Sequence, residues 1–194
     1  MNRLLCQCTN LKRLSINGEL SRASYTVVDL MPALDRHKDS LESLQIVPTL
    51  SKAQIGNTNL CFPPLKDFKA LTFLATGLSW VYDGRTIDHE EDALVRLLPT
   101  QIQTLHLYVY KRDVYQSLTQ LAHVAPALFP RLRVVVLCGL LPTKLERYRE
   151  KSWYPKGGQL VDAELPLHKA FAASGIRFAR QEWQLLVAAL RELY

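Results

Sequence analysis

The histidines and cysteines are the side chains of this chain best suited to metal binding and nucleophilic catalysis, but their spacing supports neither. The four cysteines and five histidines are Cys6, Cys8, Cys61, Cys138, His37, His89, His106, His123 and His168. Cys6 and Cys8 are separated by one residue, which suits neither the usual zinc spacing nor a dithiol redox pair, and no second Cys or His pair completes a metal site. No histidine has a carboxylate or a nucleophile at a diagnostic spacing. We therefore expect no catalytic residues, no metal site and no cofactor.

Phosphate binding and acyl transfer are also unsupported by the glycine and serine patterns. Gly157 and Gly158 lack the following Lys-Ser/Thr pair and the preceding strand of a phosphate-binding loop. No GxSxG nucleophile elbow occurs in the chain. The sequence therefore predicts a protein that is not an enzyme.

A basic segment interleaved with aromatic residues, 144–156, is a candidate binding site. Its basic residues are Lys144, Arg147, Arg149, Lys151 and Lys156, and its aromatic residues are Tyr148, Trp153 and Tyr154. Such a segment can contact phosphates while its aromatic rings stack on bases. A solvated helix with ion pairs such as Glu146 with Arg149 explains the same pattern, and no known nucleic-acid-binding motif accompanies it. Nucleic-acid association through Lys144, Arg147, Arg149 and Lys151 is therefore the alternative of two functional hypotheses.

The composition is that of a single folded domain covering residues 1–194. Hydrophobic residues make up 48% and charged residues 22% of the 194 residues, which is typical of globular proteins. The net charge of +6 is common in domains that never contact nucleic acid. No apolar run reaches the roughly 18 residues that span a bilayer, and the first residues do not form a secretory segment. We expect an intracellular protein, cytoplasmic or nuclear, that does not contact membranes.

An apolar pattern, LxxLxL, recurs along the chain and indicates repeated structural elements. These elements would position the side chains of any binding surface. Its copies are Leu11, Leu14, Ile16; Leu41, Leu44, Ile46; Phe68, Leu71, Phe73; Ile102, Leu105, Leu107; Leu132, Val135, Leu137; and a weaker Ile176, Phe178. The middle positions of the first five copies are separated by 30, 27, 34 and 30 residues. The alternation at the end of each copy predicts a short strand. The intervals are long enough for a helix to lead back to the next parallel strand.

The segments between the copies carry helical spacing. Residues 114–124 place Val114, Leu118, Leu121 and Val124 on one helical face, and Pro126 is expected beyond the end of this helix. The acidic residues of 88–92 favour a helix start, and Pro99 follows its end. No single strand-and-helix unit can cover its own apolar face, so the units are predicted to stack.

In these copies the chain resembles the leucine-rich repeat family, and more narrowly the degenerate repeats in the C-terminal part of fungal F-box proteins. The likeness covers residues 4–181 and is clearest in LLPTQIQTLHLY and LFPRLRVVVL. The resemblance implies an α/β solenoid of five to six irregular rungs, with parallel strands on one face and helices on the other. The family usually places Asn or Cys three residues after the last apolar position, and here those positions are Glu19, Thr49, Thr76, Tyr110 and Leu140.

The function implied by this resemblance is a non-enzymatic protein–protein interaction module, the substrate-recognition part of an F-box type ubiquitin ligase receptor. No helical F-box precedes the repeats in this chain, so ligase subunits are expected as partners only if a longer chain carries one. The partner bound by the repeats themselves is expected to be a protein.

The ends and one interruption of the pattern complete the predicted organisation. The spacing fails between residues 141 and 165, which predicts an insertion in the stack. A last amphipathic helix over about 181–193 is predicted to cap the end of the core. The first strand has no comparable cap, so the N-terminal cap is predicted to be missing.

The outward positions of the strands define the predicted binding surface. They are Arg13, Ser15, Asn17, Ser43, Gln45, Val47, Ala70, Thr72, Leu74, Thr104, His106, Tyr108, Val134, Val136 and Cys138. The later half is more apolar than a solvated surface requires, which predicts a protein-binding patch over Leu74, His106, Tyr108, Val134 and Val136. The alternative is that the 141–165 insertion folds over this half and buries it.

Aromatic residues in the loops after the strands extend this predicted patch. They are Trp80, Tyr82 and Tyr110, which neighbouring units would bring to one rim. Tyr and Trp are enriched in interaction hot spots. The alternative is that Trp80 and Tyr82 pack against the edge of the core.

Overall fold

The computed structural model describes residues 2–18, 27–48, 62–77, 81, 92–109, 114–139 and 158–182. The elements in chain order are α1 (Asn2–Gln7), β1 (Arg13–Gly18), α2 (Val27–Leu34), the 3-10 helix η2 (Asp35–His37), β2 (Ser43–Pro48), β3 (Phe73–Gly77), α3 (Ala93–Leu97), β4 (Thr104–Val109), α4 (Val114–Leu128), β5 (Val134–Gly139), α5 (Gly158–Ala173) and β6 (Arg177–Glu182).

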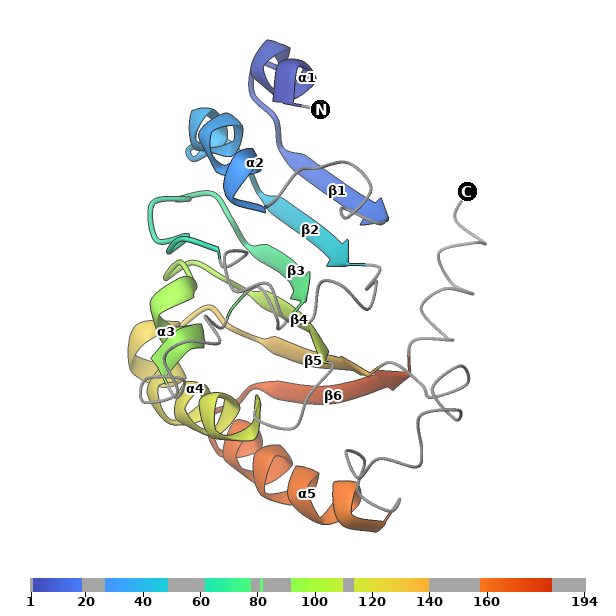
Figure 1. Cartoon of the computed structure of the whole chain (residues 1–194). Coiled ribbons are helices and arrows are strands. Elements are labelled where there is room, and N and C mark those ends of the chain that lie inside the picture. The colour runs from blue at the N-terminus through green and yellow to red at the C-terminus, as the bar shows by residue number, and fades with distance from the viewer. Residues whose placement is uncertain are drawn as a thin grey trace, which may run out of the picture.

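The strands form one six-stranded sheet in which every neighbouring pair is parallel. Their order in space, β1-β2-β3-β4-β5-β6, is their order in the chain. Figure 1 shows the five described α-helices on the same side of this sheet. The predicted α/β class with parallel strands is therefore confirmed.

The register of the sheet corrects the third copy of the apolar pattern. The pairing aligns Leu14, Leu44, Leu74, Leu105, Val135 and Phe178 across all six strands. The third copy is therefore Leu71, Leu74, Thr76, and the predicted copy Phe68, Leu71, Phe73 was wrong by three residues. The aligned positions are separated by 30, 30, 31, 30 and 43 residues, which is more regular over the first five strands than the sequence pattern indicated. Thr76 is thus the last core position of its strand and not, as expected, the position three residues beyond the last apolar one.

A short turn precedes each of the strands β3, β4 and β5, and it explains why Phe68 fits the apolar pattern without belonging to it. Each turn is closed by one backbone hydrogen bond: Leu71 N–H donates to Phe68 O at 3.1 Å, Ile102 N–H to Pro99 O at 3.2 Å, and Leu132 N–H to Phe129 O at 2.9 Å. Phe68, Pro99 and Phe129 are all buried, so the apolar residue five positions before the first residue of each of these strands is part of the turn.

The amino ends of the strands are joined by a recurring pair of backbone hydrogen bonds. One carbonyl at each strand entry accepts from two successive N–H groups of the next unit. The acceptors are Lys12 O, Glu42 O, Thr72 O and Gln103 O, and the donor pairs are the N–H groups of Glu42 and Ser43, Thr72 and Phe73, Gln103 and Thr104, and Arg133 and Val134. These bonds use main-chain atoms only, so they align successive units whatever side chains they carry.

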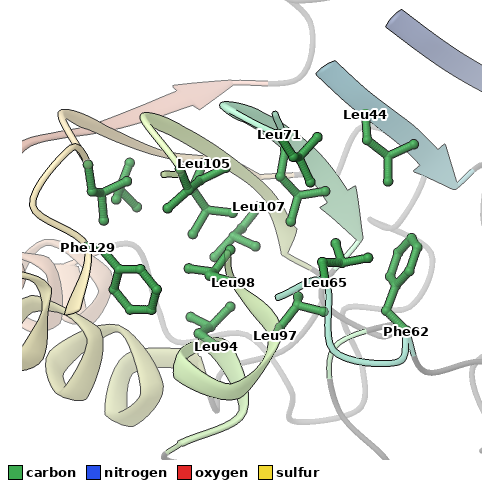
Figure 2. Close-up of a cluster of buried hydrophobic side chains, with 14 of the residues drawn as sticks. Leu44, Phe62, Leu65, Leu71, Leu94, Leu97, Leu98, Leu105, Leu107 and Phe129 are labelled. Carbon is green, nitrogen blue, oxygen red and sulfur yellow. The ribbon is translucent and has the colours of Figure 1, made fainter. Parts of the chain in front are cut away.

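The core lies between the sheet and the helices. Leu44, Leu74, Leu105, Val135 and the helix residues that face them are fully buried in one continuous cluster. Figure 2 shows side chains of the strand units, of the 62–65 segment and of α3 pointing toward one another within this cluster. The Leu65 N–H donates to Leu97 O at 2.8 Å, which ties the segment before β3 to the end of α3.

Helix α4 continues past Pro126, which the sequence placed beyond its end. Proline has no N–H, so the carbonyl four residues earlier, Ala122 O, loses its helical donor. The Ser174 hydroxyl fills this place, donating to Ala122 O at 2.7 Å. The proline and the serine together attach the end of α4 to the turn that leads into β6.

Helix α1 is anchored by a buried histidine. His37 is 3% exposed, its Nε2 lies 3.0 Å from Leu5 O, and the Leu11 N–H donates to its Nδ1 at 3.4 Å. With Nδ1 accepting, Nε2 must carry the proton and donate to Leu5 O. His37 therefore has a structural role, joining α1 and the entry to β1 to the end of η2.

The predicted ends fall partly outside the described residues. Helix α5 begins at Gly158, inside the predicted 141–165 insertion, and residues 141–157 lie outside the described part. Strand β6 includes residues 181–182 of the predicted capping helix, and residues 183–193 also lie outside it. Among the described helices, none has the length and apolar character needed to cross a membrane.

Candidate functional site

The candidate site is the sheet face opposite the described helices, here called the helix-free face. Strand alternation directs every second side chain to this face. A second apolar cluster forms there, separate from the helix-covered core, from Ala75, Tyr108, Val136 and Cys138, with Phe73, Val134 and Ala179 partly buried against it. Every member lies on one of the strands β3 to β6, so the apolar cluster lies in the second half of the face.

Burial on this face increases from the amino to the carboxyl ends of the strands. On β4, Thr104 and His106 are half-buried and Tyr108 is 1% exposed. On β5, Val134 is half-buried and Cys138 is 1% exposed. On β3 to β5 the carboxyl half of the face is therefore buried, and the amino half is the part accessible to a partner.

The accessible amino half is organised as a row of register-aligned side chains. This first row consists of Arg13, Ser43, Phe73, Thr104, Val134 and Arg177. Phe73, Thr104 and Val134 at its centre are half-buried, and the arginines at both ends are exposed. Within the described residues Arg177 forms no ion pair, and neither does the neighbouring Arg133, whose carbonyl accepts from the Arg177 N–H at 2.8 Å. The row thus combines a partly exposed apolar centre with unneutralised positive charge.

Charge is distributed unevenly along the amino ends of the strands. Lys12 Nζ lies 2.9 Å from Glu42 Oε1, and Lys69 Nζ lies 3.6 Å from Asp39 Oδ1. These exposed pairs neutralise Lys12 and Lys69 on the side of β1 to β3, although each contributes little stability. At β5 and β6 the exposed Arg131, Arg133 and Arg177 have no such acidic neighbour among the described residues.

His106 is the third residue of β4 and the second of that strand on the helix-free face, between Ala75 and Val136 in the register. Its ring centroid is 5.1 Å from that of Phe73 with the planes tilted by 58°. Desolvation by burial lowers the pKa of His106 below its usual value of 6.5. Its register neighbours are an alanine and a valine, so the ring lies in an apolar setting that favours its neutral form.

Cys138 is the one buried thiol among the described cysteines. Burial raises its pKa to about 12, so the sulfur is protonated at neutral pH and is a poor nucleophile. The described residues contain no group of three or more His, Cys, Asp or Glu side chains that could hold a metal ion.

The predicted site residues fall into three groups. His106 and Val134 lie on the helix-free face and remain partly accessible. Leu74, by contrast, is fully buried under the helices, because the corrected register directs it to the other side of β3. Tyr108 and Val136 lie on the expected face but are 1% and 7% exposed, which corrects the expectation that they are surface contacts.

The third group lies outside the described residues. It comprises the aromatic loop residues Trp80, Tyr82 and Tyr110 and the basic residues Lys144, Arg147, Arg149 and Lys151.

Phe73 and Arg177 are the site residues that the sequence interpretation missed. Phe73 was assigned to the core as the last position of the third copy. Aligning Leu74 with Leu44, 30 residues apart, would have revealed that the third copy was assigned three residues too early. This alignment places Phe73 on the face shared by Ser43 and Thr104.

Comparison of the chain with protein-family models, with curated proteins and with solved structures finds no match.

Proposed function

We propose that this chain is a leucine-rich-repeat-like domain that binds a protein partner through the first row of the helix-free face and does not act as an enzyme. The observation that carries the proposal is the accessible centre of that row, where half-buried Phe73 and Val134 lie between exposed arginines. Apolar and aromatic centres with arginine beside them are the composition of protein-binding hot spots.

The architecture supports the repeat interpretation. Six parallel strands follow one another in chain order, helices cover one side, and five successive strands align at intervals of 30 or 31 residues. Stacked units of this kind present aligned side chains as one continuous surface. The same architecture serves many partners, so the partner's identity depends on the side chains of the row.

The chemistry of the two reactive side chains supports a binding role. His106 is kept neutral beside Phe73, and Cys138 is buried as a thiol. His106 is half-buried and adds contact area beside the first row, and Cys138 is buried beneath the surface; neither supplies a general base or a nucleophile.

The test is comparative affinity purification with three forms of the chain. Val134→Asp places a charge in the accessible apolar centre, and Gln116→Asp places the same charge on an exposed position of α4. A specific partner is expected to be retained by the wild type and by Gln116→Asp and to be lost with Val134→Asp. A partner retained equally by all three forms would contradict binding through this row.

The resemblance to F-box proteins makes a narrower proposal, that the domain recognises substrates for a ubiquitin ligase. Purification of the endogenous protein tests it separately, because ligase subunits should accompany a bait that is longer than 194 residues. A bait of this length without ligase subunits would contradict the ligase proposal. The proposal that the domain binds a protein partner would be unaffected.

A further inference from the structure

The two edges of the sheet are protected to different degrees. β6 carries Arg177, Arg180 and Glu182 among its six residues, whereas Arg13 is the one charged residue of β1. Charged side chains on an edge strand are a common protection against pairing with another chain. Within the described residues β1 pairs only with β2, so the outward main-chain groups of β1 have no strand partner there, and β1 lacks this protection by charge.

The core is also less complete at β1. Leu14 and Ile16 are half-buried, whereas their register partners Leu44 and Ile46 are 0% exposed. The side chains of β1 on the helix side therefore retain apolar surface that a further strand would cover.

We infer that β1 is a homodimer interface, at which two copies of the chain pair their β1 strands antiparallel about a two-fold axis at Ser15. A two-fold interface uses the same surface on both copies and closes on itself. The two sheets become continuous, and the helix layers of both copies lie on the same side.

The hydrogen-bonding direction of β1 selects this register. Lys12 O accepts from β2, so the even residues of β1 direct their main-chain groups inward and the odd residues direct theirs outward. Pairing about Ser15 sets the outward groups of Arg13 against those of Asn17 and those of Ser15 against their own copy. Every outward group is then used, giving about six main-chain hydrogen bonds.

The side chains are compatible with the same register. Leu14 of one copy lies opposite Ile16 of the other, which covers the apolar surface left half-buried in the single chain. Arg13 lies opposite the uncharged Asn17, so no like charges face each other directly.

Head-to-tail pairing of β6 with β1 of a second copy is disfavoured by charge. Continuing the sheet register would set Arg177 against Arg13 and Arg180 against Ile16. Like charges directly opposite each other destabilise a strand pair. This repulsion leaves the closed two-fold dimer as the favoured self-association.

Sedimentation velocity of the whole chain tests the inference. We expect a concentration-dependent shift from 22.1 kDa to twice that mass. Ser15→Pro removes the outward N–H at the centre of the interface but leaves the inward bonds from β1 to β2, and it should raise the dimer dissociation constant by about tenfold or more. Ser15→Thr keeps the N–H and should dimerise like the wild type. A wild-type chain that stays monomeric, or a Ser15→Pro chain that dimerises normally, would overturn the inference.

Cross-linking keeps the inference testable if Ser15→Pro fails to fold. Ser15→Cys, introduced together with Cys6→Ser, Cys8→Ser and Cys61→Ser, should give a covalent dimer on oxidation, because directly opposed residues of antiparallel strands have Cα atoms within disulfide range. The same triple-serine background with Ser15 retained keeps only the buried Cys138 and should stay uncross-linked. Equal cross-linking of both forms would contradict pairing at Ser15.

Discussion

At the scale of single residues, Thr76 is the least satisfied side chain of the core. Its register neighbours are Ile46 and Leu107, and its Oγ1 is buried without a hydrogen-bond partner in the described part of the chain. A buried hydroxyl without a partner costs the free energy of removing it from water.

Replacing this hydroxyl with a methyl group should therefore stabilise the protein. Thr76→Val is expected to raise the free energy of unfolding by about 1 kcal/mol, measured by urea denaturation. Thr76→Ser keeps the hydroxyl and removes the methyl, so it should lower stability by about 1 kcal/mol. A Thr76→Val protein less stable than wild type would show that the hydroxyl has a partner that stabilises the fold.

The lowered pKa of His106 predicts a pH dependence of stability. Because burial lowers the folded-state pKa below the unfolded value of 6.5, the unfolded chain binds more protons in the interval between the two values. Stability should therefore be fully present above pH 6.5 and fall as the pH drops from there toward the folded pKa. Denaturation midpoints measured across this interval should show the slope in wild type and a smaller slope in His106→Gln. An unchanged slope would assign the effect to another group.

Cysteine reactivity should follow burial. Alkylation under native conditions should modify the exposed Cys6 and Cys8 and spare Cys138, whose pKa is raised to about 12 by burial. Mass spectrometry of the native and the denatured protein separates the two classes. Modification of Cys138 as fast as that of Cys6 would mean that the carboxyl half of the helix-free face opens readily.

At the scale of elements, the attachment of α4 to the turn before β6 depends on one side chain. The Ser174 hydroxyl lies 2.7 Å from Ala122 O and 3.2 Å from Ala170 O, and the first of these carbonyls is free because residue 126 is proline. Ser174→Ala should lower the free energy of unfolding by about 1 kcal/mol in thermal or chemical denaturation.

A double-mutant cycle isolates this interaction. Pro126→Ala restores an N–H that can bond to Ala122 O within the helix. Ser174→Ala should then cost less in the Pro126→Ala background than in wild type. Equal costs in both backgrounds would show that the serine does not compensate for the proline.

The elements also show what the sequence could predict. The strands at Leu14, Leu44, Leu105 and Val135 followed from apolar spacing, because the helix-covered side of each is continuously apolar. The third strand was shifted because Thr76 interrupts that apolar side while Phe68, a turn residue, completes a false copy of it. The apolar spacing of the sequence shows only which side chains are apolar. The pairing register of the sheet shows which side of the strand each of them occupies.

The candidate site was less predictable than the fold. Alternation correctly placed Val134 and His106 on the helix-free face, but it carried no information on burial along the strand. Tyr108 and Val136 have the composition of a binding patch and are nevertheless buried, because exposure depends on what packs over the face and not on the residue's own type.

At the scale of the whole molecule, each strand contacts only its neighbours in the chain order, so stability should be greatest in the middle of the sheet. In a dilute sample, where the chain is monomeric, main-chain amides of β3, β4 and β5 should exchange with deuterium more slowly than those of β1, whose Leu14 and Ile16 are half-buried. Exchange measured by mass spectrometry in a concentrated sample should slow at β1 first. Slower exchange at β1 than at β4 in the dilute sample would contradict this order.

The paired backbone bonds at the strand entries have a consequence for how such a protein changes in length. Lys12, Glu42, Thr72 and Gln103 offer the next unit the same acceptor, and the bonds require no particular side chain. A gene duplication that copied one interval of about 30 residues would therefore insert a strand that its neighbours can receive without altering their own sequences. The number of strands and the side chains of the first row could then change independently. The length of the sheet and the molecule that it binds would evolve as separate traits.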